Sequence, residues 1–259
     1  MTPILKTREE IAIMREAGRI VARAHEAMRK AVKPGITTRE LDEIAADVIR
    51  THDALPSFLH YAPYPGVRPY PAVITACINE ELVHGIPGPR KLKEGEIISL
   101  DVGATYKGFV GDAAFSMGVG KISAEHQKLL EVTEAALYKG IEASRLGNSS
   151  RDVAIAIQSY VESFGYNVPR QYGGHGVGRE MHEPPSMPNW APRRRRRFRG
   201  VILQVGMTYA LEPMVIMGGK EVHTLDDQWT VVTSDGSTCA HFEHSIAITD
   251  GEAEILTQL

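Results

Sequence analysis

Apolar residues recur at every third or fourth position along four stretches of the chain, a spacing that predicts amphipathic helices. These stretches cover about residues 8–32, 38–49, 123–141 and 150–161. The first two follow Thr7 and Thr37, each with a glutamate three positions later, which is the capping-box signature of a helix start. We therefore expect four helices, arranged along the chain as two pairs.

Strand-like runs follow each predicted helix pair. Residues 55–71, rich in proline and tyrosine, predict a loop with an edge strand. The strand-like runs are residues 72–78, 96–106 and 109–120 after the first pair, and 173–178, 207–217, 229–235 and 241–249 after the second. This order predicts two similar halves, about residues 7–120 and 121–250. No linker-like composition separates them, so we expect a single α+β domain over residues 1–259.

The composition is ordinary for a soluble globular protein, with 43% hydrophobic and 24% charged residues. No apolar run is long enough to cross a bilayer, and the N-terminus lacks the apolar core of a signal peptide. Two cysteines, Cys77 and Cys239, make no disulfide framework. We therefore expect a cytoplasmic protein without membrane contact.

The net charge of −3 hides a strongly basic segment, because six arginines lie within residues 193–199. The rest of the chain carries 23 basic against 32 acidic residues. Such a run usually forms a solvated loop. The alternative is a contact with RNA or another polyanion.

Four acidic residues stand inside otherwise apolar runs: Asp101, Asp112, Glu212 and Glu243. A hairpin that reverses near residues 107–108 would bring the first two side by side. Buried carboxylates without a partner are too costly to keep ionised. Together with His175, these acids predict a site for divalent cations such as Mn²⁺, Fe²⁺, Co²⁺ or Zn²⁺. Five ligating side chains suit two ions, and scattered surface acids are the alternative.

The segment "GGHGVGREMHEPP", residues 173–185, places four glycines around His175 and a second histidine, His182, seven positions later. The spacing is not a dinucleotide-binding fingerprint. Two prolines directly after His182-Glu183 also exclude the zinc-binding helix with two histidines. We expect the glycines to let the backbone at His175 press against metal ions. A buried core histidine is the alternative.

The chain resembles the type I methionine aminopeptidases. The resemblance rests on "DVGATYKGFVGD", "YGGHGVGREMHEPPSMPNW", "LEPM" and "FEHSIAIT", in that order, and on "INEELVHGIPG" at residues 78–88. It spans residues 7–259 and implies the pita-bread fold, two pseudo-symmetric αβ halves around a curved antiparallel sheet. It also implies a monomer that removes the N-terminal methionine from nascent proteins and peptides with a small second residue.

The resemblance assigns two divalent ions to Asp101, Asp112, His175, Glu212 and Glu243. Asp101 would chelate one ion, Asp112 and Glu243 would bridge, and His175 with Glu212 would complete the second. A metal-bridging hydroxide would attack the scissile carbonyl, with Glu212 as the general base.

Two further histidines match residues of the family that bind no metal. His182 would donate to the carbonyl oxygen as it becomes anionic, and His84 would contact the scissile amide nitrogen. The implied methionine pocket is Phe58, Tyr61, Tyr70, Thr75, Met181 and Trp229, for which plain core packing is the alternative.

Two segments depart from the family pattern. Residues 62–73 are longer than the usual connection, so the choice of pocket tyrosine stays open, and residues 191–206 contain the arginine run. We expect residues 193–199 to be a candidate ribosome contact. The alternative functions are an X-Pro-cleaving peptidase of the same fold and a metal-free relative that binds RNA or protein. A serine hydrolase is excluded because no Gly-x-Ser-x-Gly motif occurs.

Overall fold

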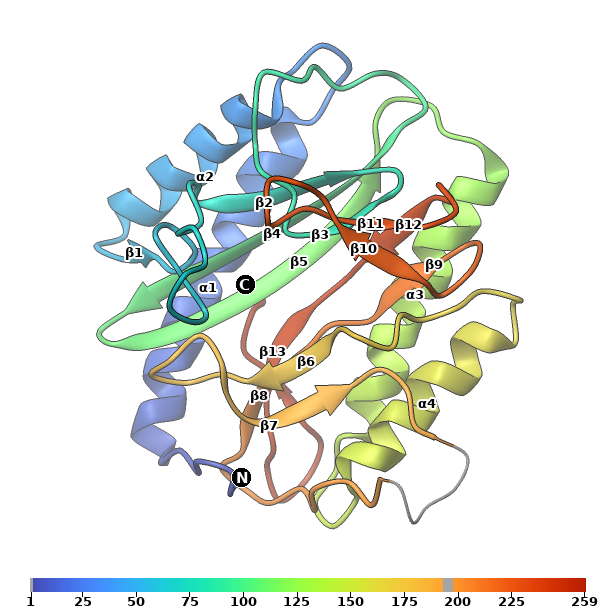
Figure 1. Ribbon diagram of the computed structural model, residues 1–259. Coiled ribbons are helices and arrows are strands. Elements are labelled where there is room, and N and C mark those ends of the chain that lie inside the picture. Colours follow the sequence, from blue (N-terminus) through green and yellow to red (C-terminus); the bar gives the residue numbers. More distant parts are fainter. Residues whose placement is uncertain (1, 193–197) are drawn as a thin grey trace.

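The computed structural model describes residues 2–192 and 198–259 and contains the four expected helices (Figure 1). They are α1 (Arg8–Ala31), α2 (Thr38–Thr51), α3 (Ala124–Ala143) and α4 (Ser150–Glu162). Thr7 accepts the backbone N–H of Glu10, and the Glu10 side chain accepts the N–H of Thr7. Thr37 and Glu40 repeat this exchange, so both predicted capping boxes are present.

Two antiparallel sheets form the centre of the molecule. In the first, β4 (Ile97–Tyr106) pairs along its whole length with β5 (Phe109–Gly118), and it also pairs with β1 (Leu55–Pro56) and β2 (Ile74–Ile78). The second has the order β14 (Glu254–Ile255), β13 (His244–Ala247), β8 (Thr208–Leu211), β6 (Gly173–Gly176) and β7 (Glu183–Pro188). β1 is the edge strand that the proline-rich segment predicts.

Smaller pairings complete the strands. β3 (Glu81–Val83), β11 (Val231–Thr233) and β10 (Val222–Thr224) form a three-stranded sheet, while β9 (Met214–Ile216) pairs with β12 (Cys239–His241).

A seam of hydrogen bonds joins the two large sheets beside β5. The N–H of Glu243 donates to the carbonyl of Ala114 at 2.9 Å. The Ser245 hydroxyl donates to the Asp112 carbonyl at 2.8 Å and accepts the Asp112 N–H at 3.1 Å. This seam places Asp112, from the first half of the chain, next to Glu243 from the second.

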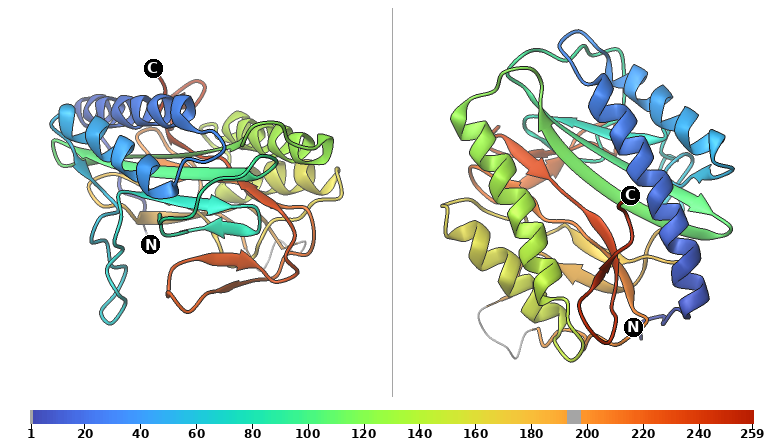
Figure 2. Two further views of the ribbon diagram at one scale, coloured as in Figure 1. Left: turned by 90° about the horizontal axis from the view of Figure 1, so that it is seen from above. Right: turned by 180° about the vertical axis from the view of Figure 1, so that it is seen from behind.

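The helices lie together on one face of the sheets (Figure 2). Seen from behind, α1 and α3 cross this face with the C-terminal segment between them. The loop between β1 and β2 projects from the opposite face. Apolar side chains of α1, β4, β5, α3 and β8 form one continuous core, so the helix face is sealed and the opposite face is left for a site.

None of the helices in the described part of the chain combines the length and apolar character that a membrane span requires. The predicted ribosome contact at residues 193–199 lies largely outside the described residues.

Candidate metal centre

The β4–β5 hairpin brings Asp101 and Asp112 together, as the sequence predicts. Asp112 faces Gly103 across the hairpin and Asp101 faces Ala114, so the two carboxylates are diagonal neighbours on the same side of the sheet. Both are buried, Asp112 with 2% of its surface exposed. Lys107 and Gly108, both at positive φ, form the turn.

Glu212 and Glu243 lie between strands, and the prediction that they stand within strands is wrong. Glu212 separates β8 from β9, and Glu243 separates β12 from β13. Pro213, which has no N–H to donate, helps to interrupt the ladder after Glu212. Leu211 of β8 pairs with His244 of β13, so the two interruptions are adjacent.

His175 presents a lone pair to the carboxylates. Its Nδ1 lies 3.0 Å from the carbonyl oxygen of Gly176, which can only accept, so Nδ1 carries the proton. Burial lowers the pKa of His175 to about 3 and keeps the ring neutral. Its Nε2 lies 3.6 Å from Oε1 of Glu212 and 3.9 Å from Oδ2 of Asp112, which suits a shared cation better than direct hydrogen bonds.

The glycines beside His175 allow neighbouring strands to approach closely, and a close approach of this backbone to metal ions stays a prediction. A Cβ on Gly174 would stand 2.2 Å from the carbonyl oxygen of Ala210 on β8. A Cβ on Gly176 would stand 2.5 Å from the carbonyl oxygens of Glu183 and Pro184. Only glycine therefore lets β6 fit between β7 and β8 with His175 facing the acids.

Burial and mutual repulsion raise the pKa values of the clustered carboxylates. Burial raises the pKa of Asp112 to about 8. Burial, followed by the neighbouring carboxylates, raises the pKa values of Asp101, Glu212 and Glu243 well above their usual range. Such groups stay ionised only when a nearby positive charge compensates them.

Several ligand-type atoms in the cluster have no hydrogen-bond partner within the described part of the chain. They are Oδ1 of Asp101, Oδ1 of Asp112, Oε1 of Glu243 and Nε2 of His241. Two groups bring their ligand atoms within 4.8 Å of one another: Asp112 with His175 and Glu243, and Glu212 with His241 and Glu243. Orphaned oxygens and imidazole nitrogens at this spacing fit divalent cations.

His241 is a residue of this cluster that the sequence analysis did not assign. Its Nε2 lies 3.7 Å from Oε2 of Glu212 and 3.7 Å from Oε2 of Glu243, and only 2% of the residue surface is exposed. Side chains two positions apart in extended chain share a face. The spacing of His241 from Glu243 was therefore the signal that could have found it.

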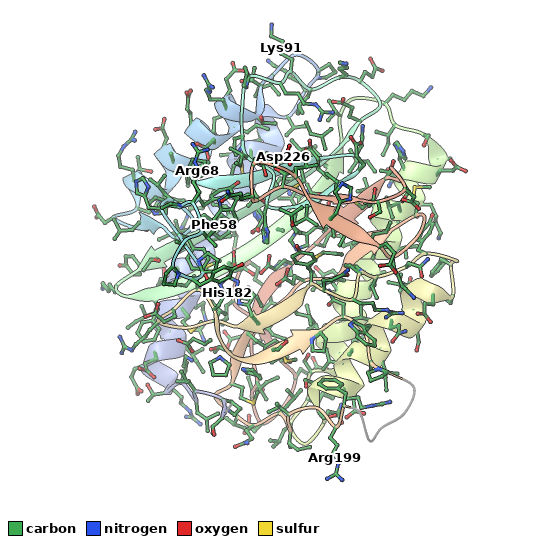
Figure 3. All side chains as sticks on the ribbon, viewed as in Figure 1. Phe58, Arg68, Lys91, His182, Arg199 and Asp226 are labelled. Carbon is green, nitrogen blue, oxygen red and sulfur yellow. The ribbon has the colours of Figure 1, made fainter. Side chains whose placement is uncertain are left out.

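All thirteen predicted site residues line one cavity of about 340 Å³. The metal-ligand candidates form one part of its wall, and the predicted pocket residues form an apolar part, with Pro63 as an additional member. Figure 3 shows Phe58 and His182 close together on the face opposite the helices. Both candidate tyrosines, Tyr61 and Tyr70, contribute to the wall.

The non-ligand histidines are held by aromatic neighbours. Nδ1 of His182 lies 2.7 Å from the Tyr61 hydroxyl, and its ring centroid lies 4.0 Å from that of His175. His84 adopts a positive φ of 62°, which is uncommon outside glycine. Its ring is nearly perpendicular to that of Trp229, with the centroids 6.2 Å apart. Burial lowers the pKa of His84 to about 4, so its ring is neutral.

The chain is similar to known proteins over nearly its whole length. Residues 12–250 match the model of metallopeptidase family M24. The chain is 50% identical to methionine aminopeptidase 1 of Bacillus subtilis over 99% of each chain. It superposes on a methionine aminopeptidase from Thermotoga maritima with a TM-score of 0.92 and 43% identity over 100% of both chains.

A more distant structure shares the fold alone. An Xaa-Pro dipeptidase from Bacillus anthracis aligns with a TM-score of 0.78 at 23% identity, over 99% of this chain and 62% of its own. Both structural matches confirm the predicted pita-bread fold. The chain belongs to metallopeptidase family M24.

Proposed function

We propose that this chain is a metal-dependent methionine aminopeptidase, which hydrolytically removes the N-terminal methionine from peptides and nascent proteins with a small second residue. The observation that carries the proposal is one cavity that joins five ligand-type side chains, three of them buried and two partly buried, to an apolar pocket. Relatives named methionine aminopeptidase match over nearly the whole chain and support it.

Two divalent ions, drawn from Co²⁺, Mn²⁺, Fe²⁺ or Zn²⁺, would be held by Asp101, Asp112, His175, Glu212 and Glu243. The orphaned carboxylate oxygens and the neutral His175 are the donor set that such ions require. When bound, the ions would acidify a water molecule and polarise the scissile carbonyl.

The remaining steps belong to side chains of the cavity. Glu212 would accept the proton of the attacking water and pass it to the leaving amine. His182 would donate a hydrogen bond to the carbonyl oxygen as negative charge develops there. His84, on the same wall, would contact the scissile amide nitrogen.

The apolar wall would receive the methionine side chain. Met181 and Trp229 are each 8% exposed and Phe58 is 7% exposed, so the wall of this apolar slot is almost withdrawn from water. A slot of this kind separates methionine from a shorter side chain by only about 1–3 kcal/mol. Preference for a small second residue would therefore arise from crowding beyond the metal ligands.

Two alternatives are less well supported. The X-Pro-cleaving peptidase shares the fold at low identity, whereas methionine aminopeptidases match at high identity. A metal-free binding protein would not need a filled set of five ligand-type residues. Cytoplasmic location, a monomeric state and a ribosome contact through residues 193–199 stay predictions.

A substrate comparison tests the proposed function. Protein loaded with Mn²⁺ would be incubated with Met-Ala-Ser and, separately, with Ala-Pro, and the released amino acids would be quantified. We expect release of methionine from Met-Ala-Ser and no hydrolysis of Ala-Pro. Preferential cleavage of Ala-Pro would establish the alternative peptidase, and no cleavage of either peptide would contradict the proposal.

A further inference from the structure

Lys6 and Glu183 form an ion pair that is almost completely withdrawn from water. The Lys6 Nζ donates to Oε2 of Glu183, and the two side chains are 3% and 4% exposed. The partners stand 177 positions apart in the chain. Because desolvating two charges is costly, a buried pair is weak support for a role in stability alone.

The Glu183 carboxylate also closes the loop of residues 178–183. Its second oxygen, Oε1, accepts the backbone N–H of Arg179 at 2.7 Å and that of Glu180 at 3.2 Å. This loop carries Met181 and His182, both of which line the cavity. One carboxylate thus connects the buried lysine to the segment that aims His182.

The lysine approaches from a fixed N-terminal segment. Its backbone N–H donates to the carbonyl of Gly206 at 2.7 Å, and Leu5 forms a bridge with Met207 ahead of β8. A Cβ on Gly178 would stand 2.3 Å from Cε of Lys6 and 2.7 Å from Oε1 of Glu183. The lysine stem therefore packs directly against the first residue of the loop.

We propose that Lys6 is a positioning residue that acts through Glu183 to hold His182 in its productive place. This inference rests on the proposed function, which places His182 at the reacting carbonyl. Without Lys6, the Glu183 carboxylate is left buried without its cation. The loop then opens so that water can solvate this charge, and His182 moves away from the substrate and from Tyr61.

The first test is Lys6→Met, which keeps the length of the stem and removes the charge. We expect kcat for Met-Ala-Ser to fall by about tenfold or more while KM changes by less than about threefold, because a misplaced donor weakens the transition state more than binding. Trypsin should also cut faster after Arg179, an exposed residue of the loop, and the fragment mass identifies this site.

Arg15→Met is the matched control. Like Lys6, Arg15 forms an ion pair with a residue far away in the sequence. Its Nε lies 2.6 Å from Oε1 of Glu254, but both side chains are about a third exposed. It should leave kcat and cleavage after Arg179 unchanged. A wild-type kcat in Lys6→Met would overturn the proposal, and so would a loss of kcat without faster cleavage.

The double variant Lys6→Met/Glu183→Gln covers the case in which Lys6→Met does not fold. The glutamine oxygen can still accept both loop amides, and no buried charge is left. We expect kcat to return to within about threefold of the wild type, since the penalty arises from an unpaired carboxylate. A folded double variant that stays inactive would overturn the coupling through Glu183.

If the unmodified protein releases no methionine, the proposed function fails, whereas the rate of cleavage after Arg179 still tests the role of the ion pair.

Discussion

Tyr61 fixes the nitrogen of His182 that carries the proton. Burial raises the pKa of Tyr61, so its hydroxyl keeps its hydrogen, and burial lowers the pKa of His182, so its ring is neutral. We infer that the hydroxyl donates to Nδ1 across 2.7 Å, an arrangement that leaves the N–H on Nε2. That tautomer supplies the donor that a developing oxyanion requires.

Replacing this hydroxyl tests the tautomer argument. In Tyr61→Phe the ring still packs against His182, but Nδ1 loses its donor. We expect kcat for Met-Ala-Ser to fall by about tenfold or more with little change in KM, because the lost interaction serves the transition state. Tyr64→Phe, at an exposed tyrosine of the same loop, is the control and should behave as the wild type. Equal kcat values in both variants would contradict the assignment.

His25 links stability to pH from the far side of the sheet. Its Nε2 donates to the Ala113 carbonyl at 2.9 Å, and burial lowers its pKa from 6.5 to about 3. Between these two pH values the unfolded chain holds a proton that the folded chain excludes. The His25 contribution is therefore fully present above pH 6.5, and it is lost as the pH falls toward 3.

His25→Gln retains a donor for Ala113 and removes the titration. The free energy of unfolding of the metal-free wild type should fall relative to that of the variant by about 1.4 kcal/mol per pH unit below pH 6.5. Urea denaturation at pH 6.5, 5.5 and 4.5 measures this difference. The clustered carboxylates titrate equally in both proteins, so their contributions to the free energy of unfolding cancel in the difference. Parallel pH profiles would show that His25 is not kept neutral by the fold.

At the scale of single elements, β6 depends on glycine for its place between β7 and β8. A Cβ on Gly174 would meet the Ala210 carbonyl oxygen at 2.2 Å, and backbone cannot move aside as a flexible side chain can. The same strand carries His175, so its displacement would also move a candidate ligand.

Gly174→Ala should lower the free energy of unfolding of the metal-free protein by about 1–3 kcal/mol, because the added methyl overpacks the sheet. Gly88→Ala is the control, since nothing lies within 4 Å of a Cβ at Gly88. Urea midpoints for the two variants provide the comparison. A Gly174→Ala midpoint equal to that of Gly88→Ala would contradict the account of strand spacing.

Local signals predicted the elements whose structure depends on nearby residues. Thr7 and Thr37 marked two helix starts because a capping box closes within four residues. The turn near Lys107 predicted the hairpin that joins Asp101 to Asp112. The interruptions at Glu212 and Glu243 were missed. Pro213 was a local signal for the first, whereas the second lies beside the first only through pairing between strands that are remote in the sequence.

The ion pair of Lys6 and Glu183 illustrates the limit of sequence reasoning. Neither residue stands in an unusual local pattern, and only the packing of the N-terminal segment beside β8 brings them together. His241 lies between these cases, because its spacing from Glu243 was visible while its burial beside Glu212 was not.

At the scale of the whole molecule, the candidate metal centre is shared between two sheets. The β4–β5 hairpin supplies Asp101 and Asp112, and the second half of the chain supplies His175, Glu212 and Glu243. The seam of hydrogen bonds beside Asp112 holds the two sets together. The fold was predicted through the resemblance, and the boundaries of its halves at 7–120 and 121–250 stay predictions.

The most direct test of the central claim is methionine release from Met-Ala-Ser by metal-stripped protein, before and after addition of Mn²⁺ or Co²⁺, with Glu212→Ala measured in parallel. The account predicts no release without metal, release after metal addition, and a loss of at least about a hundredfold in the variant. Folded wild-type protein that releases no methionine with any divalent ion would contradict it, as would a Glu212→Ala variant with wild-type activity.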